Sequence, residues 1–210
     1  MTNEKIIRKK AQDIYKNLGW PSLFARLKFY FAPLVKIEAL VPKEGLIVDL
    51  GCGYGLFSHY VGVAEPKRRV LGFDLDKEKV KYGDRGYPNV TCRYGDITKV
   101  EIPQADCIIF THVLHHLTSY ESQKELLLTC KDKLREGGLL IVTDVGERPL
   151  WKHFLCYLAD RILYPKDKLH YRTVKEMSRL LAEIFHNVQV VPMDEGTLFP
   201  HVTFLCVRRT

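Results

Sequence analysis

A short apolar run that ends in three closely spaced glycines constrains the fold of this chain more than any other feature. Residues 48–55 read Val-Asp-Leu-Gly-Cys-Gly-Tyr-Gly, and a second apolar run reaches Asp74 about twenty residues later. Glycine lets a backbone approach a ligand without a Cβ in the way, and a helix that follows such a turn begins with unpaired N–H groups. The pattern predicts a buried strand, a glycine-rich turn, a helix, and a second strand that carries Asp74 at its carboxyl end.

The spacing of the glycines separates two classes of ligand. A dinucleotide-binding turn reads G-x-G-x-x-G, and its third glycine lets the helix pack closely on the strand. Here the spacing is G-x-G-x-G, and Leu56 stands where that third glycine would be. A carboxylate in the position of Asp74 is placed to accept hydrogen bonds from ribose hydroxyls. We therefore expect an adenosine-bearing ligand. A nicotinamide dinucleotide and a turn that binds nothing are the disfavoured alternatives.

Apolar or β-branched runs alternate with helical segments along the chain, which indicates a parallel sheet covered on both faces. The predicted strands are residues 45–50, 69–73, 90–94, 105–111, 139–143, 188–191 and 202–207. The last two runs lie close together and are expected to pair antiparallel at the sheet edge. Predicted helices cover residues 3–18, a stretch from Ser22 to the break at Ala32-Pro33, and two segments that open with capping-box patterns at Thr118 and Thr173 and run to about Leu134 and Phe185.

The pattern Asp-x-Gly-x-Gly-x-Gly at residues 49–55 resembles motif I of the class I S-adenosylmethionine-dependent methyltransferases, of the small-molecule type. Further segments follow in the family's order, namely Asp74, Gly95-Asp96-Ile97, residues 106–117 and residues 134–144. The resemblance is good over residues 44–145 and looser over residues 173–210.

The resemblance implies an α/β fold with a doubly wound, mostly parallel seven-stranded sheet whose last strand is antiparallel. It divides the chain into an N-terminal helical cap, residues 1–43, and a Rossmann-like methyltransferase domain, residues 44–210. A helical insertion after the fifth strand, at about residues 146–172, would form a substrate cap. In an open α/β sheet of this kind the ligand binds at the carboxyl ends of the strands.

By the same resemblance the cofactor is S-adenosylmethionine and its product is S-adenosylhomocysteine. Asp49 is expected near the ammonium group of the methionine moiety, Asp74 at the ribose, and Asp96 at the adenine amino group. The expected cofactor-binding residues are Asp49, Gly51, Cys52, Gly53, Gly55, Asp74, Leu75, Asp96, Ile97, Thr111 and His112.

Several histidines follow the fourth predicted strand. His112 and His116 are four residues apart, which would put them on one helical face and makes a metal site an alternative to weigh. No Glu or Cys stands nearby at ligand spacing, and the family commonly carries His-Leu here without metal, so we predict no metal site. His115 or His116 is the candidate general base or substrate-orienting group, and packing is the alternative role. Weaker candidates on the expected acceptor side are Asp144, His153, His170 and Tyr171.

Positive charge is concentrated outside the expected cofactor-binding core. Residues 1–43 carry nine Lys and Arg against three Asp and Glu, and residues 147–175 carry seven against three. Both basic segments also hold apolar stripes at helical spacing. The first stripe is Leu23, Phe24, Leu27 and Phe31, and the second is Trp151, Phe154, Leu155, Leu158 and Ile162.

Three interpretations of these stripes stay open. They pack on each other or on the sheet as a closed cap, they line a pocket for a hydrophobic acceptor, or one of them enters a membrane interface while its cations meet anionic headgroups. Nucleic acid is disfavoured as a partner, because the cations are interleaved with large apolar groups and no nucleic-acid motif is present. The sequence does not indicate an oligomeric state.

The sequence therefore predicts an enzyme that transfers a methyl group, by in-line displacement, to a small hydrophobic or amphiphilic acceptor. One alternative is a methyltransferase of a lipid or quinone-type acceptor at the membrane surface. The other is a non-enzymatic cofactor-binding or scaffolding protein with the same fold.

Cysteine usage and hydropathy bear on the cellular location. The six cysteines are scattered without a C-x-x-C pair, which suits reduced thiols. The charged N-terminus lacks the apolar segment of a signal peptide, and no apolar run is long enough to span a bilayer. We expect a cytoplasmic protein, with a peripheral position on the inner membrane face as the alternative.

Overall fold

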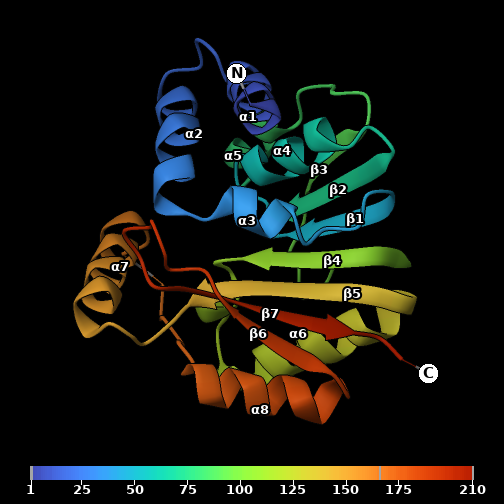
Figure 1. Ribbon diagram of the computed structural model, residues 1–210, viewed down its shortest axis with the longest axis vertical. Coiled ribbons are helices and arrows are strands. Elements are labelled where there is room, and N and C mark those ends of the chain that lie inside the picture. Colours follow the sequence, from blue (N-terminus) through green and yellow to red (C-terminus); the bar gives the residue numbers. More distant parts are fainter. Residues whose placement is uncertain (1, 166, 210) are drawn as a thin grey trace.

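The computed structural model describes residues 2–165 and 167–209, which form a seven-stranded sheet with helices on both faces (Figure 1). The strand order is β3-β2-β1-β4-β5-β7-β6, and β7 runs antiparallel to both of its neighbours while the other pairs are parallel. The prediction of a mostly parallel seven-stranded sheet with an antiparallel last strand is confirmed. The strands are β1 Gly45–Leu50, β2 Arg68–Asp74, β3 Val90–Tyr94, β4 Ala105–Thr111, β5 Leu134–Val145, β6 Val188–Pro192 and β7 His201–Val207.

Successive residues of the central strands point to opposite faces of the sheet and feed two separate cores. Ile108 and Phe110 of β4 pack with α6 and α8 on one face, while Cys107 and Ile109 pack with the N-terminal helices and α4 on the other. The helices are α1 Asn3–Asp13, α2 Trp20–Phe31, α3 Leu34–Glu38, α4 Leu56–Ala64, α5 Lys77–Gly83, α6 Tyr120–Lys133, α7 Leu150–Leu163 and α8 Val174–Ile184, with a short 3-10 turn, η1, at Leu114–His116.

Some predicted helix ends are wrong by a few residues. The first helix ends at Asp13 rather than at residue 18, and α2 begins at Trp20, because Pro21 fits the first turn of a helix as well as it ends one. The capping box of α6 starts at Ser119, whose hydroxyl accepts from the Ser122 N–H, and not at Thr118. The predicted capping box at Thr173 is confirmed.

The apolar stripe of the insertion is exposed within the part of the chain that the structure describes. Phe154 is 63% exposed and Ile162 is 69% exposed, and Trp151, Leu155 and Leu158 are exposed as well. The interpretation that this stripe packs as part of a closed cap is therefore wrong for α7. Helix α7 lies beyond the carboxyl ends of β1 and β4, on the same side of the sheet as α2 (Figure 1).

A buried arginine ties the N-terminal helices to the sheet. Arg68, at the start of β2, is only 2% exposed. Its guanidinium donates to the Glu38 carboxylate at 2.6 Å and to the carbonyl oxygens of Val41, Pro42 and Val61 at 2.7 to 3.0 Å. One side chain thus satisfies backbone groups at the ends of α3 and α4, which would otherwise be buried without partners.

We predict that Arg68→Ala lowers the free energy of unfolding by about 3 kcal/mol or more, because it leaves Glu38 and three carbonyl groups without their donor. Urea denaturation followed by circular dichroism measures the change. The matched control is Arg69→Ala, which removes the exposed neighbour on the same strand and should cost less than about 0.5 kcal/mol. Equal losses in the two variants would contradict this role of Arg68.

Candidate functional site

Backbone hydrogen bonds hold the glycine-rich loop after β1 against the end of β2. The N–H groups of Gly51 and Cys52 donate to the Phe73 carbonyl at 2.8 and 3.0 Å, and the Gly53 N–H donates to Asp74 Oδ2 at 2.7 Å. Gly51 has a φ of 80°, and a Cβ there would lie 2.4 Å from the Val113 side chain. The loop conformation therefore requires glycine at this position.

A cavity of about 770 Å³ opens at the carboxyl ends of β1, β2 and β4. A Cβ on Gly53 would meet no described atom within 4 Å, so this glycine borders open space. Ten of the expected cofactor residues line the cavity, namely Asp49, Gly51, Cys52, Gly53, Asp74, Leu75, Asp96, Ile97, Thr111 and His112. Gly55 is the exception, because it caps α4 with a φ of 71° and packs against Cys92 and Gly83.

The acidic residues of the cavity differ in environment. Asp49 is 3% exposed and accepts a hydrogen bond from the Ser58 hydroxyl at 2.6 Å. Burial nevertheless raises the pKa of Asp49 from 3.8 to about 6. The Asp74 carboxylate also accepts from the Asp76 N–H at 2.9 Å. Hydrogen bonds from Thr98, together with Lys99 at 3.2 Å, lower the pKa of Asp96. Of these three carboxylates, Asp49 is the one whose pKa burial raises.

One hydroxyl in the cavity wall has no partner. The Thr111 Oγ1 is buried and makes no hydrogen bond with any described residue, although native proteins satisfy most buried polar groups. The unpartnered hydroxyl and the open space beside Gly53 are both consistent with a polar ligand bound in this cavity.

His112 does not share a helical face with His116, contrary to expectation. Its φ of 58° is left-handed, its N–H donates to the Thr143 carbonyl, and η1 begins only at Leu114. His201 Nε2 donates to the Phe31 carbonyl at 2.6 Å, so His201 Nδ1 must accept from His112 Nε2 at 2.9 Å. Burial lowers the pKa of His112 far below its usual range and that of His201 to about 4, so both rings are neutral.

His115 is enclosed behind the cavity wall. Its Nδ1 lies 2.5 Å from Asp144 Oδ1, and its ring stacks on Tyr171 with the ring centres 4.5 Å apart. Its Nε2 faces Asp160 Oδ2 at 3.5 Å and has no hydrogen-bond partner among the described residues. Burial opposes the charged form, but the carboxylates of Asp144 and Asp160 outweigh it and raise the pKa of His115 to about 9.

His116 lines the cavity itself. Its Nδ1 lies 3.0 Å from Asp167 Oδ2, and its ring packs edge-on against Tyr164. Burial and the neighbouring His115 lower the pKa of His116, although Asp160 and Asp167 oppose this. The structure thus places the two candidate histidines side by side but shifts their pKa values in opposite directions, that of His115 upward and that of His116 downward.

The weaker candidates form hydrogen bonds with groups around this pair of histidines. His170 Nδ1 bonds to the Leu117 carbonyl at 2.9 Å, and the Tyr171 hydroxyl donates to Asp160. His153 Nδ1 bonds to the Gly146 carbonyl at 3.0 Å. None of these three side chains lines the cavity.

Sequence reasoning missed several residues that shape the site. Asp160 and Asp167 come from the insertion, and the available signal for Asp160 was that it is the single acidic residue of α7. Cations and an aromatic ring also line the cavity without having been predicted, namely Lys28, Lys79 and Tyr164.

Comparison with known proteins gives one family match. A family model described as an O-methyltransferase domain matches residues 34–183. A "probable S-adenosylmethionine-dependent methyltransferase" of Mycolicibacterium smegmatis is 30% identical over 99 residues, which are 46% of this chain and 37% of that protein. The chain spans 37% to 52% of the length of the first curated relatives that it matches.

Solved structures of low sequence identity share the fold. A possible histamine N-methyltransferase from Thermotoga maritima has a TM-score of 0.68 at 16% identity, and the match covers 94% of this chain and 99% of that one. A family 2 O-methyltransferase from Planctomyces limnophilus, solved in complex with apigenin, has a TM-score of 0.67 at 18% identity, covering 96% of this chain and 65% of that one.

The raised pKa of Asp49 predicts a pH-dependent cost to stability. Because the folded-state pKa is about 6 and the usual value is 3.8, folding disfavours the charged form, and this cost is absent below pH 4 and complete above pH 6. Asp49→Asn should therefore stabilise the protein by about 2 kcal/mol at pH 7.5 and by less than about 1 kcal/mol near pH 4.5.

Chemical denaturation of wild type and variant at the two pH values tests this. The control is Asp106→Asn. The Asp106 carboxylate lies 2.6 Å from the Arg135 guanidinium, so its removal should destabilise the protein at pH 7.5. A stabilisation by Asp49→Asn that is independent of pH would contradict the assignment.

Proposed function

Since the chain belongs to the O-methyltransferase domain family, we propose that it transfers the methyl group of S-adenosylmethionine to a small hydrophobic or amphiphilic acceptor. The family model covers residues 34–183, more than half of the chain. The predictions of an S-adenosylmethionine-dependent methyltransferase domain and of its cofactor are thereby confirmed. The activity of the whole protein is part of the proposal, because the chain spans only part of its curated relatives.

One observation supports the assignment of a donor site: the glycine-rich loop and three carboxylates line the same cavity. We propose that Asp49 binds the ammonium group of the methionine moiety, Asp74 the ribose hydroxyls and Asp96 the adenine amino group. The buried Asp49 carboxylate supports this role, because a cation is the partner that would stabilise its charged form. The unpartnered Thr111 hydroxyl offers a further polar contact.

The acceptor is proposed to enter between the N-terminal cap, residues 1–43, and the insertion, residues 146–172. Phe24 and Lys28 of α2 line one side of the cavity, and Leu163 and Tyr164 at the end of α7 line another. Apolar and aromatic side chains with few cations suit a hydrophobic or amphiphilic molecule. The description of the family as an O-methyltransferase domain favours an oxygen nucleophile.

When bound, S-adenosylmethionine supplies a methyl carbon on a positively charged sulfur, which an acceptor lone pair attacks in line while the carbon–sulfur electrons return to sulfur. The residues of the chain align the two molecules and exclude water. An acceptor hydroxyl must also lose its proton. His116 lines the cavity, and His115 lies beside it, so we propose this pair as the place where the acceptor oxygen is bound and activated.

Transfer of a labelled methyl group into extracts of the source cells tests this function. We expect label from S-adenosylmethionine in a product that partitions into organic solvent, and loss of that label with Asp74→Asn, whose carboxylate holds the Gly53 N–H. Asp84→Asn, at an exposed position outside the cavity, is the matched control. Tight binding of S-adenosylhomocysteine without label in any fraction would favour the non-enzymatic alternative.

The exposed apolar faces beside the cavity favour one second candidate, in which the acceptor is a lipid or quinone-type molecule taken from a membrane surface. Both α2 and α7 contribute residues to the cavity and present large apolar side chains to solvent. The exposed side chains are Trp20, Leu23, Leu27 and Tyr30 on α2, and Leu150, Trp151, Phe154, Leu155, Tyr157, Leu158, Ile162 and Leu163 on α7.

Cations outnumber anions on the two helices that carry these faces. Residues 14–37 contain no Asp or Glu, and the one acidic residue of α7, Asp160, points inward to His115. Exposed cations such as Arg26, Arg148 and Arg161 are left to meet anionic headgroups. Within residues 2–165 and 167–209 no helix is long and apolar enough to cross a bilayer, so this candidate is a surface association.

Flotation with vesicles that contain phosphatidylglycerol tests the membrane candidate. We expect the wild type to float at low salt and to be released as salt screens the headgroups, and Phe154→Glu combined with Ile162→Glu to abolish flotation. Leu128→Glu, which places the same charge at an exposed leucine of α6, should leave flotation intact. A double variant that floats like the wild type, or a wild type that never floats, would rule out this surface.

A further inference from the structure

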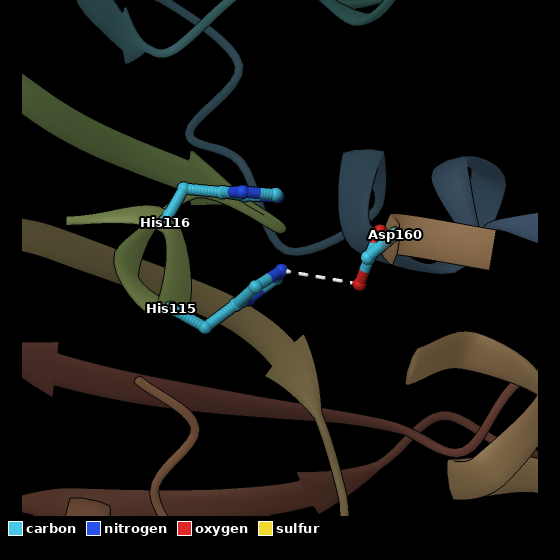
Figure 2. A group of neighbouring side chains, drawn as sticks. All are labelled: His115, His116 and Asp160. Atoms are coloured by element: carbon cyan, nitrogen blue, oxygen red, sulfur yellow. Dashed lines mark ion pairs between the residues drawn. The ribbon is translucent and has the colours of Figure 1, made fainter. Parts of the chain in front are cut away.

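Two adjacent histidines and one carboxylate lie close together beside the cavity. His115 and His116 extend from η1, and Asp160 extends from α7 to meet them (Figure 2). One ligand atom from each residue lies within 4.8 Å of the other two. Imidazole nitrogens with a carboxylate oxygen are the donor set that proteins use for zinc and for non-haem iron.

Each histidine is oriented by a second carboxylate behind it. Asp144 binds His115 Nδ1 at 2.5 Å, and Asp167 binds His116 Nδ1 at 3.0 Å. In its neutral form, a ring that donates its Nδ1–H to a carboxylate has its Nε2 lone pair available for a cation, which would take the place of a proton there. Histidines that bind metals are held in this way by carboxylates that do not touch the metal themselves. The cluster therefore contains both the ligands and the groups that would orient them.

The unpartnered Nε2 of His115 is the independent observation that points to a ligand. This nitrogen is buried, has no hydrogen-bond partner among the described residues, and faces Asp160 Oδ2 at 3.5 Å, as the dashed line in Figure 2 marks. This contact is an ion pair only when a positive charge lies between Nε2 and the carboxylate oxygen, and either a proton on Nε2 or a bound cation supplies that charge. The Tyr171 hydroxyl, which donates to Asp160 and whose ring stacks on His115, holds the facing groups in place.

We propose that His115, His116 and Asp160 bind a divalent transition-metal cation of the zinc or iron type. Three protein ligands leave one coordination position open, as in catalytic rather than structural zinc sites. Because His116 also lines the cavity, the site borders the space proposed for the acceptor. This proposal replaces the sequence-based prediction that no metal is bound. That prediction considered only ligands near His116 in sequence and therefore not Asp160.

The role of the cation rests on the proposed function, whereas its binding does not. A cation at this position would coordinate the acceptor oxygen and lower the pKa of its hydroxyl, so that the hydroxyl would give its proton to solvent water before methyl transfer. The histidines would then act as metal ligands rather than as general bases. The requirement for the cation would be confined to acceptors with a hydroxyl nucleophile.

Titration of the chelator-treated full chain with Zn²⁺, in competition with a chromophoric chelator, tests the site. We expect one equivalent to bind, with an affinity at least 100-fold weaker in His116→Gln and in Asp160→Asn. Asp167→Asn, which removes only the orienting carboxylate, should weaken binding 10- to 100-fold. The control is His186→Gln, an exposed histidine outside the cluster, which should bind as the wild type does.

A second readout separates metal loss from misfolding. Co²⁺ bound by the wild type should give visible absorption bands that His116→Gln lacks, while the circular dichroism of the two proteins agrees. Zn²⁺ affinities that are equal in wild type and cluster variants would overturn the proposal. Binding of S-adenosylhomocysteine to the metal-free protein is measured separately, so a missing metal site and a missing donor site give different results.

Discussion

The hydrogen bond from the Gly53 N–H to the Asp74 carboxylate joins the two halves of the site, and the rest of the structure around the cavity depends on it. Two further N–H groups of the loop donate to the Phe73 carbonyl, so the end of β2 fixes the backbone of the loop after β1. The other oxygen of Asp74 holds the turn that leads into α5. One carboxylate therefore shapes the donor side of the cavity and also lines it.

Features that cost stability gather around this cavity. Among the described residues, Asp49 is a buried carboxylate without a cationic partner, and Thr111 and His115 each keep a buried polar atom without a hydrogen bond. His112 adopts a left-handed backbone. Strain and unsatisfied groups of this kind persist where the surrounding structure over-determines them, and they cluster at functional sites. Their position at the carboxyl edge of the sheet agrees with the general location of ligands in open α/β folds.

The acceptor side is built differently from the donor side. Its residues come from α2, η1 and the insertion rather than from strand ends, and they combine aromatic rings with paired histidines and carboxylates. The same two helices that contribute to the cavity leave large apolar side chains exposed. The chemistry of the acceptor and its route of entry are thus encoded in segments that lie outside the strands of the sheet.

Strands and the donor site are predictable from the sequence because they follow local rules. Asp49, the three glycines and Asp74 lie within one strand–turn–helix–strand unit, and the alternating faces of β4 need only period-two patterning. The contact between Asp160 and His115 joins residues that are far apart in sequence. It depends on how the insertion packs against η1, so no local sequence pattern predicts this contact. Helical periodicity likewise indicates which residues of α7 share a face, but not whether that face is covered.

Calorimetric titration of the full chain with S-adenosylmethionine and, separately, with NAD tests the central claim most directly. The glycine spacing, Leu56 and the carboxylates of the cavity predict binding of one equivalent of S-adenosylmethionine and no heat with NAD. Binding of NAD without binding of S-adenosylmethionine would contradict the assignment of this cavity as a methyl-donor site.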